Sequence, residues 1–254
     1  MKTLYLDLSK GAAGDMLTAA LYELLDDNQK KEFSEKVNSL GIDGVEVIIK
    51  NTVKYGVSGT SVDVIINGVI EGEDHHQDHH HEHHHEHRSM DDVMNIINSL
   101  NVSDDVKKNA KKIYGEIADA ESVAHAVPVT EVHFHEVGAV DAIVDVTAVC
   151  VLMEMLAPDK VYATPVCVGY GTVECAHGIL PVPAPATANI LKDLPTYPGD
   201  TEGEMCTPTG AAVLRSFVDE FGPLPKIESS IKGYGIGKRD YGVSSALNAF
   251  LATD

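Results

Sequence analysis

Apolar positions recur along the chain with two different spacings, and these spacings predict its secondary structure. Alternating or β-branched runs are typical of strands, and they predict strands at residues 3–8, 45–50, 61–66, 132–136, 160–168 and 172–175, near residue 231 and at 246–251. Apolar positions three and four residues apart predict helices at residues 15–25, 29–40, from about 90, and at 103–124, 138–156, 186–191 and 207–221. Strands and helices mixed in this order favour an α/β fold with a mixed sheet flanked by helices.

One segment breaks this pattern completely. Residues 71–87 contain nine His, six Asp or Glu and no apolar side chain, so they cannot contribute to a hydrophobic core. We expect a disordered His-rich loop here. The chain then divides into an N-terminal αβ segment (residues 1–70), a His- and acid-rich linker (71–89) and a main α/β domain (90–254). The alternative is that the first and last of these share one sheet.

The overall composition narrows the class of protein. The chain has 254 residues, is 44% hydrophobic and carries a formal net charge of −20, which favours a folded core and disfavours nucleic acid or anionic membrane as a partner. No apolar run is long enough to cross a bilayer and no targeting segment is visible. The four cysteines form no Cys-x-x-Cys pair. We therefore expect a cytoplasmic protein with reduced thiols.

The His-rich segment is the strongest candidate for metal binding. Imidazole is the common protein ligand for nickel, zinc, copper and cobalt, and the interleaved carboxylates lower the electrostatic cost of gathering dications. The spacing is not that of a single structural zinc site, so we predict several loosely held, exchangeable ions. It does not select one metal, and a merely solvated linker is the alternative. The predicted ligands are His75, His76, His79, His80, His81, His83, His84, His85 and His87.

A second candidate site is the sequence HFHEVGAVDAIVD, which begins at His133. In an extended segment His133 and His135 point to the same side. In the helix that follows, Asp141 and Asp145 are four residues apart and share a face. They interrupt an otherwise apolar helix, in which an unpaired charge would be costly. Together with Glu136 they predict a divalent-cation site. The alternative is structural, because the helix dipole favours acids in a first turn.

Two further groups of residues carry candidate chemistry. Cys175 and His177 alternate to one face and offer a thiolate and an imidazole, although a Cys-x-His pair alone fits a structural role equally well. The strand–turn–helix unit at the N-terminus either cradles a phosphate at the helix start or holds Mg²⁺ or Mn²⁺ between two carboxylates. It is not a Walker A loop. The candidate residues for phosphate, nucleotide or hard-cation binding are Asp7, Gly11, Gly14, Asp15, Thr207, Thr209, Lys238 and Arg239.

Taken in order, these motifs resemble those of one known family. The chain contains DLSKGAAGDM from Asp7, HFHEVGAVDAIVD from His133, CAHGILPVPAPAT from Cys175, TPTGAA from Thr207 and GYGIGKRD from Gly233. It resembles the nickel-insertion proteins of lactate racemase maturation (the LarC family) over essentially its whole length. The His-rich segment lies where that family often carries one.

The resemblance implies an activity. Members are cytoplasmic nickel chelatases, or cyclometallases, of the lyase class that place Ni(II) into pyridinium bisthiocarboxylic acid mononucleotide, giving the nickel-pincer nucleotide in which nickel is bonded to two sulfurs and a ring carbon. They use CTP hydrolysis with Mn(II) or Mg(II). Full-length members continue well beyond this chain, and that later part carries the CTP site. The chain is therefore expected to be the N-terminal portion and to need the C-terminal portion for CTP-dependent turnover.

The resemblance also assigns roles and partners. The His-rich segment gathers Ni(II), the residues from His133 to His177 form the transfer or active site, and Lys238 and Arg239 meet the substrate's phosphate. Lactate racemase is a further partner, and the full-length form is a homo-oligomer. Two other functions stay open: a nickel store or metallochaperone in which only the His-rich segment acts, and a metal-dependent nucleotide hydrolase using the aspartates.

Overall fold

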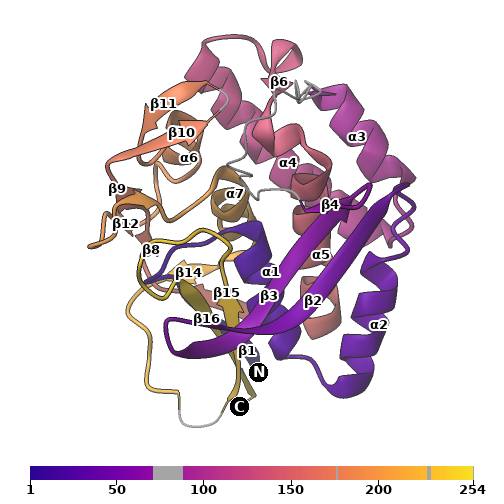
Figure 1. The fold of residues 1–254 in the computed structure, drawn as a ribbon, viewed down its shortest axis with the longest axis vertical. Coiled ribbons are helices and arrows are strands. Elements are labelled where there is room, and N and C mark those ends of the chain that lie inside the picture. Colours follow the sequence, from indigo (N-terminus) through magenta and orange to yellow (C-terminus); the bar gives the residue numbers. More distant parts are fainter. Residues whose placement is uncertain (71–87, 176, 228–229, 254) are drawn as a thin grey trace.

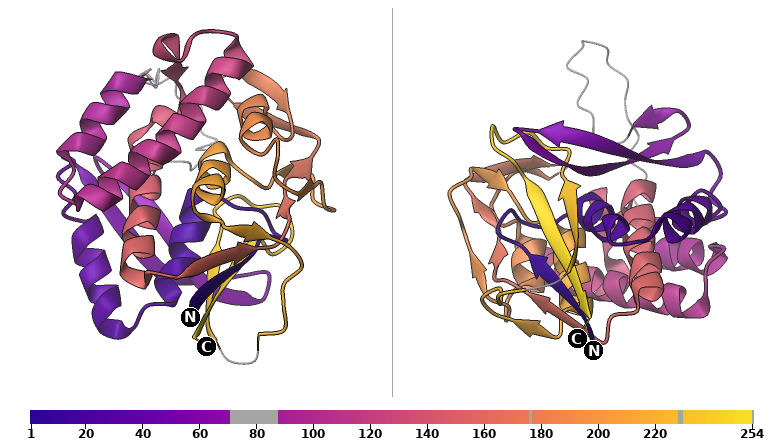
Figure 2. Two further views of the ribbon diagram at one scale, coloured as in Figure 1. Left: turned by 180° about the vertical axis from the view of Figure 1, so that it is seen from behind. Right: turned by 90° about the horizontal axis from the view of Figure 1, so that it is seen from below.

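The structure, a computed structural model, describes residues 1–70, 88–175, 177–227 and 230–253. These residues form a mixed eight-stranded sheet with the order β14-β7-β1-β16-β15-β3-β2 and with β4 beside β3 (Figure 1). β1 is parallel to β7 and antiparallel to β16, which places the two ends of the chain side by side (Figure 2). The strands of this sheet are β1 (Lys2–Asp7), β2 (Val45–Lys54), β3 (Val57–Ile66), β4 (Val69–Ile70), β7 (Lys160–Ala163), β14 (Glu220–Phe221), β15 (Ile231–Ile236) and β16 (Ala246–Thr253).

The helices pack on this sheet in layers, which confirms the predicted α/β class. α1 lies directly on β15, β3 and β16, α5 packs on α1, and α4 packs on α5 (Figure 2). α6 and α7 also contact α4. The helices are α1 (Gly14–Glu23), α2 (Asp27–Val37), α3 (Met90–Ser99), α4 (Asp104–His125), α5 (Val140–Leu156), α6 (Pro185–Ile190) and α7 (Pro208–Phe217), with short 3₁₀ turns η1 (Val129–Glu131) and η2 (Glu136–Gly138).

α5 is the central helix of the core. Val, Ile and Thr have lower helix propensity than Ala or Leu, but α5 contacts α1, α2, α4 and α7, and burial of its apolar side chains on all these sides outweighs that preference. Asp141 and Asp145 are the two acidic residues in its first turns, and both are only half-buried. The predicted buried helix is thus confirmed.

Four two-stranded sheets lie outside the large sheet in the described residues. β8 (Val166–Cys167) pairs with β12 (Thr196–Tyr197), and β9 (Gly169–Tyr170) pairs with β13 (Gly203–Glu204). β10 (Thr172–Cys175) and β11 (Gly178–Pro181) form a hairpin, and β5 (Arg88–Ser89) pairs with β6 (His133–Phe134).

Several predicted elements have different bounds in the structure, and three of these differences have a clear physical cause. The predicted strand 132–136 is reduced to β6, because the 3₁₀ turn η2 begins at Glu136. The predicted strand 160–168 is split, because Pro165 cannot donate a hydrogen bond to a ladder, and β8 pairs with β12 instead of β1. The predicted helix 207–221 ends at Phe217, because the next residues pair with β7 as β14.

The predicted His-rich loop lies outside the described residues. The residue that follows it, Arg88, pairs with Phe134 across β5 and β6, and its guanidinium donates to the Gly138 carbonyl at 2.9 Å. Arg88 is therefore paired with the residue directly before His135. In the part of the chain that the structure describes, no helix has both the length and the apolar character needed to cross a membrane.

Candidate functional site

A cavity of about 190 Å³ opens between segments that are distant in sequence. Its wall is formed by the last turns of α4, the segment after β6, the β10–β11 hairpin and the first residues of α6 and α7. Val137, Val173 and Leu180 contribute apolar surface. The polar groups that line it among the described residues are His125, His135, His177, Glu121, Glu136, Glu204 and Cys175.

Three imidazole rings meet in this cavity. The ring centroids of His135 and His177 are 4.2 Å apart, those of His125 and His177 are 4.9 Å apart, and those of His125 and His135 are 6.4 Å apart. His125 is the last residue of α4, where Ala126 turns into the left-handed conformation with a φ of 53°. His135 precedes η2, and His177 lies in the turn between β10 and β11. Tertiary packing, not local sequence, brings these rings together.

Glu121 lies one helical turn before His125 and faces it. Its carboxylate is 3.4 Å from His125 Nε2, and the Glu121 side chain is 15% exposed. Burial raises the pKa of Glu121, the nearby His125 and His177 lower it, and Glu136 adds to the rise. Sequence reasoning did not select Glu121 or His125. The signal that could have found them is the Glu-x-x-x-His spacing at the end of a predicted helix, which places both side chains on one face.

His133 does not line the cavity. It is exposed on β6, opposite Ser89 in the β5–β6 pairing. Phe134 between the two histidines is buried and His135 is partly buried, but only His135 of the two lines the cavity. His135, Glu136, Cys175 and His177 are therefore the predicted residues that the structure brings together here.

A second cluster lies where α1 begins. A Cβ added at Gly14 would be 2.8 Å from the Cβ of Asp145, so α1 and α5 touch at this point. Asp15 is buried, with 9% exposure. Burial raises the pKa of Asp145 well above its usual range, the neighbouring Asp15 and Asp141 add to that rise, and Lys238 opposes it. Burial likewise raises the pKa of Asp15, against the attraction of Lys238 and Arg239.

The Mg²⁺ or Mn²⁺ site expected between Asp7 and Asp15 stays a prediction. Asp7 ends β1 and accepts hydrogen bonds from the Ser9 backbone at 3.0 Å and from Asn248 Nδ2 at 3.3 Å. The turn after β1 is also filled from within, since a Cβ at Gly11 (φ 83°) would be 1.8 Å from the Met205 carbonyl oxygen. Ala12 N–H donates to that same carbonyl. The partner of Asp15 comes from α5, which the spacing along the chain did not indicate.

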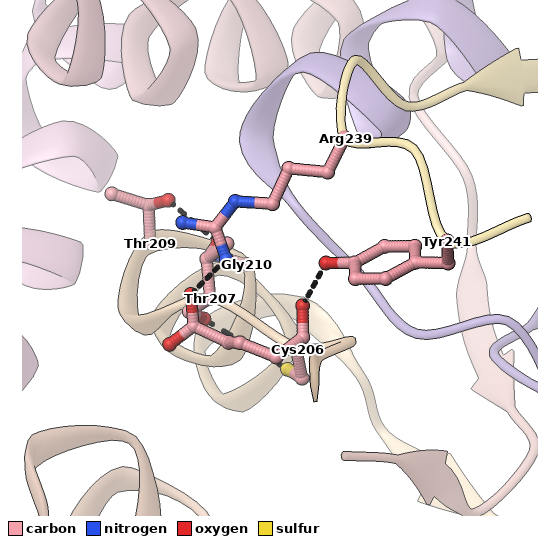
Figure 3. A network of polar contacts seen from close by, with 7 residues as sticks. Cys206, Thr207, Thr209, Gly210, Arg239 and Tyr241 are labelled. Atoms are coloured by element: carbon pink, nitrogen blue, oxygen red, sulfur yellow. Dashed lines mark hydrogen bonds and ion pairs between the residues drawn. The ribbon is translucent and has the colours of Figure 1, made fainter. Parts of the chain in front are cut away.

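Glu204 connects the cavity with this second cluster. Arg239 donates to Glu204 Oε2 at 2.8 Å, and the Tyr241 hydroxyl donates to the Glu204 carbonyl (Figure 3). Burial raises the pKa of Glu204, Arg239 lowers it and Glu136 raises it further. Thr207 caps α7, with its hydroxyl accepting from Gly210 N–H and lying 3.1 Å from that of Thr209 (Figure 3). Of the two predicted basic residues, Arg239 therefore lies beside the cavity and is already paired with Glu204, whereas Lys238 lies near Asp15 and Asp145.

The arrangement offers two kinds of chemistry side by side. The cavity has imidazole and thiol groups, which suit nickel, copper and zinc. The cluster at the start of α1 has carboxylates, which suit a hard cation, and near them Lys238, whose charge suits a phosphate. Across the described residues, no three or more His, Cys, Asp or Glu side chains already have the arrangement of a metal site. Side-chain movement is therefore needed before an ion can bind.

The chain matches one family along almost its whole length. A family model described as "Nickel insertion protein" matches residues 4–254. No solved structure matches the chain.

Curated relatives give the same picture. A pyridinium-3,5-bisthiocarboxylic acid mononucleotide nickel insertion protein of Clostridium kluyveri is 44% identical over 254 residues, covering 99% of this chain and 62% of the relative. Proteins of the same name are 42% identical in Geobacillus kaustophilus (94% of this chain, 57% of the relative) and 41% identical in Lactiplantibacillus plantarum (99% and 61%). The chain thus spans about three fifths of the length of these relatives.

Proposed function

Because the chain belongs to the nickel insertion protein family, we propose that it forms the nickel-binding part of an enzyme that places Ni(II) into pyridinium-3,5-bisthiocarboxylic acid mononucleotide. The observation that carries this proposal is the cavity in which His125, His135 and His177 converge next to Glu204 and Arg239. A metal insertase needs soft or intermediate ligands for the ion and a separate cationic region for the nucleotide. The cavity supplies the first, and Arg239, paired with Glu204 in the cavity wall, begins the second.

The two ends of the site match the two ends of the substrate. The mononucleotide carries a phosphate, and its pyridinium ring carries two thiocarboxylates on either side of one ring carbon. We place the phosphate near Lys238, whose charge acts on Asp15 and Asp145. The ring then extends toward the imidazoles, where the sulfurs reach the nickel ion.

Insertion exchanges a proton for the metal. The ring C–H bond breaks, a C–Ni bond forms, the proton passes to a base, and the oxidation state of nickel does not change. Glu121 suits the role of base because it lines the cavity and its raised pKa increases its affinity for a proton. Its interaction with His125 keeps it beside the metal-binding end.

The remaining features of the family resemblance are part of the same proposal. We assign the CTP-dependent step with Mn(II) or Mg(II) to sequence that the relatives carry beyond the region matched here. The product would serve lactate racemase. This division of labour is supported by the share of each relative that the chain covers, 57–62% in the three compared.

Reconstitution of nickel insertion tests the proposal. The chain is combined with the remaining portion of the Clostridium kluyveri relative, the mononucleotide, Ni(II), CTP and Mn(II), and the nickel-containing product is measured by its absorption and mass. We expect product only when both portions are present. His135→Ala and Asp141→Asn should reduce it at least a hundredfold, about 2.7 kcal/mol of transition-state stabilisation, with little change in melting temperature.

The control is His133→Ala, which removes an exposed imidazole from outside the cavity. Its product yield should match that of the unchanged chain. Full product formation by His135→Ala would refute the assignment of the cavity as the insertion site, and full product formation by Asp141→Asn would refute a role for the aspartates of α5. Both results together would favour a nickel store that acts through residues 71–87 alone.

A further inference from the structure

The three imidazole rings of the cavity have a specific geometry. Their centroids are separated by 4.2, 4.9 and 6.4 Å. A triangle with these sides has an angle of about 90° at His177, and the circle through its corners has a radius of about 3.2 Å. The centre of that circle falls midway between the rings of His125 and His135, and it is the one point in the plane of the centroids at equal distance from all three.

That radius is the distance expected for a metal ion bound by imidazole. An ion lies about 2.0–2.1 Å from the nitrogen that binds it, and therefore about 3.2 Å from the centroid of the ring. The angle distinguishes between coordination geometries. Three imidazoles of a tetrahedral site would have centroids about 5.2 Å apart in every pair, whereas one long and two shorter separations correspond to two ligands opposite each other and a third at a right angle to both.

We propose that His125, His135 and His177 form a binding site for one divalent transition ion, with His125 and His135 opposite each other and His177 between them, and that this geometry selects Ni(II) over Zn(II). Square-planar and tetragonal sites with nitrogen ligands favour Ni(II) and Cu(II), whereas zinc favours tetrahedral sites. The inference deepens the proposed function by naming the ligands and the coordination geometry of the metal.

Rotation of the imidazole rings is needed to bring their nitrogens toward the ion. Rotation about χ2 of a histidine, a soft torsion, turns the ring about an axis that passes almost through its centroid. The nitrogens therefore move while the centroids stay in place. This explains how the described residues contain no ready-made metal group although the three rings already have the correct spacing.

Glu121 fixes the orientation of one of the rings. Its carboxylate is 3.4 Å from His125 Nε2, which leaves Nδ1 of the same ring for the ion. A carboxylate that holds the second nitrogen of a metal-binding histidine is a common arrangement, and its loss lowers metal affinity roughly 10–100-fold. Glu121 is thus a positioning residue for the metal in addition to its place in the cavity wall.

The positions that the histidines leave open match the substrate. In a six-coordinate ion, three ligands arranged in this way leave three positions with the same arrangement, one opposite His177 and two above and below the plane of the rings. The planar mononucleotide ring presents a carbon flanked by two thiocarboxylate sulfurs. The carbon fits the position opposite His177, and the sulfurs fit the other two.

Metal binding to a variant of the 254-residue chain tests the site without any measurement of insertion. The nine histidines of residues 71–87 are replaced by Asn so that their ions do not mask the cavity. We expect this variant to bind one Ni(II), and to bind Co(II) with the weak visible absorption of a six-coordinate ion. His125→Ala and His177→Ala should each weaken Ni(II) binding at least tenfold, Glu121→Gln should weaken it less, and His133→Ala should leave it unchanged.

Two results would overturn the inference. One is intense Co(II) absorption, which marks a tetrahedral site. The other is Ni(II) affinity that His125→Ala and His177→Ala leave intact while both variants melt at the normal temperature. If either variant fails to fold, His125→Gln and His177→Gln give the same comparison with less loss of packing. Because no product is measured, a failure of reconstituted insertion leaves this result standing, and the two proposals can fail separately.

Discussion

The hydroxyl of Tyr114 connects the core to the candidate site, and its removal gives a quantitative prediction. Tyr114 is fully buried in α4, its ring packs edge-on against Phe134 at 6.0 Å, and its hydroxyl donates to the Val137 carbonyl at 3.0 Å. That carbonyl belongs to η2, the turn that directly follows His135. Tyr114→Phe keeps the ring and deletes only this hydrogen bond.

The expected loss follows from the burial. Leaving a buried carbonyl without its donor costs about 1–3 kcal/mol, and in a chain of this size each kcal/mol lowers the melting temperature by about 2–4 °C. We expect calorimetry to show a decrease of roughly 2–12 °C. Because η2 is then less firmly held, His135 should lose its position. When Tyr114→Phe is made in the variant whose nine histidines of residues 71–87 are replaced by Asn, Ni(II) should bind the cavity several-fold more weakly.

Tyr22→Phe is the matched control. Tyr22 pairs with Phe33 between α1 and α2, and neither helix lines the cavity, so its loss should leave Ni(II) affinity unchanged. A Tyr114→Phe protein with a lower melting temperature but normal Ni(II) affinity would refute the idea that this hydrogen bond positions His135. An unchanged melting temperature would refute the energetic estimate itself.

Three further predictions concern the charges. Asp145→Asn should raise the melting temperature at pH 8 and have little effect at pH 4. Burial raises the pKa of Asp145, so the folded protein loses stability as the pH rises from the ordinary range of a carboxyl toward the raised value. A variant that is less stable at pH 8 would contradict this. Lys238→Ala should weaken mononucleotide binding about 10–100-fold in calorimetry, as expected for one charge-assisted hydrogen bond. The control is Lys232→Ala, which removes a lysine that lies over the Phe250 ring and should leave mononucleotide binding unchanged. Replacing the nine histidines of residues 71–87 by Asn should remove most of the bound Ni(II) yet leave a single cooperative transition, and loss of that transition would show that the segment is part of the fold.

Most helices and strands were predictable because their signals are local. Ser103 accepts a hydrogen bond from Val106 N–H and starts α4, and Thr207 with Pro208 starts α7, as the capping rules indicate. The errors occur where a distant partner decides. α7 ends at Phe217 because residues beyond it find hydrogen bonds on β7, a strand more than fifty positions earlier in the chain.

The candidate site divides in the same way. His135, Glu136, Cys175 and His177 could be selected from the sequence because their types and spacing suit metal chemistry, and the family motifs point to nickel. The sequence could not show that His133 lies outside the cavity, since its place opposite Ser89 depends on the pairing of β5 with β6. It also could not show that Asp15 meets Asp145, because that contact depends on the packing of α1 on α5.

The sequence alone therefore determined the class of fold, the family and the types of side chain that are candidate metal ligands. Each of these depends on residue identity and on spacing within about one element. Tertiary structure decided which ligands share a cavity. His125, His135 and His177 lie on three segments whose order in the chain contains no information about their separation in space. Their convergence results from packing α4 against α5 and α6, and this packing depends on the shapes of many apolar side chains at once.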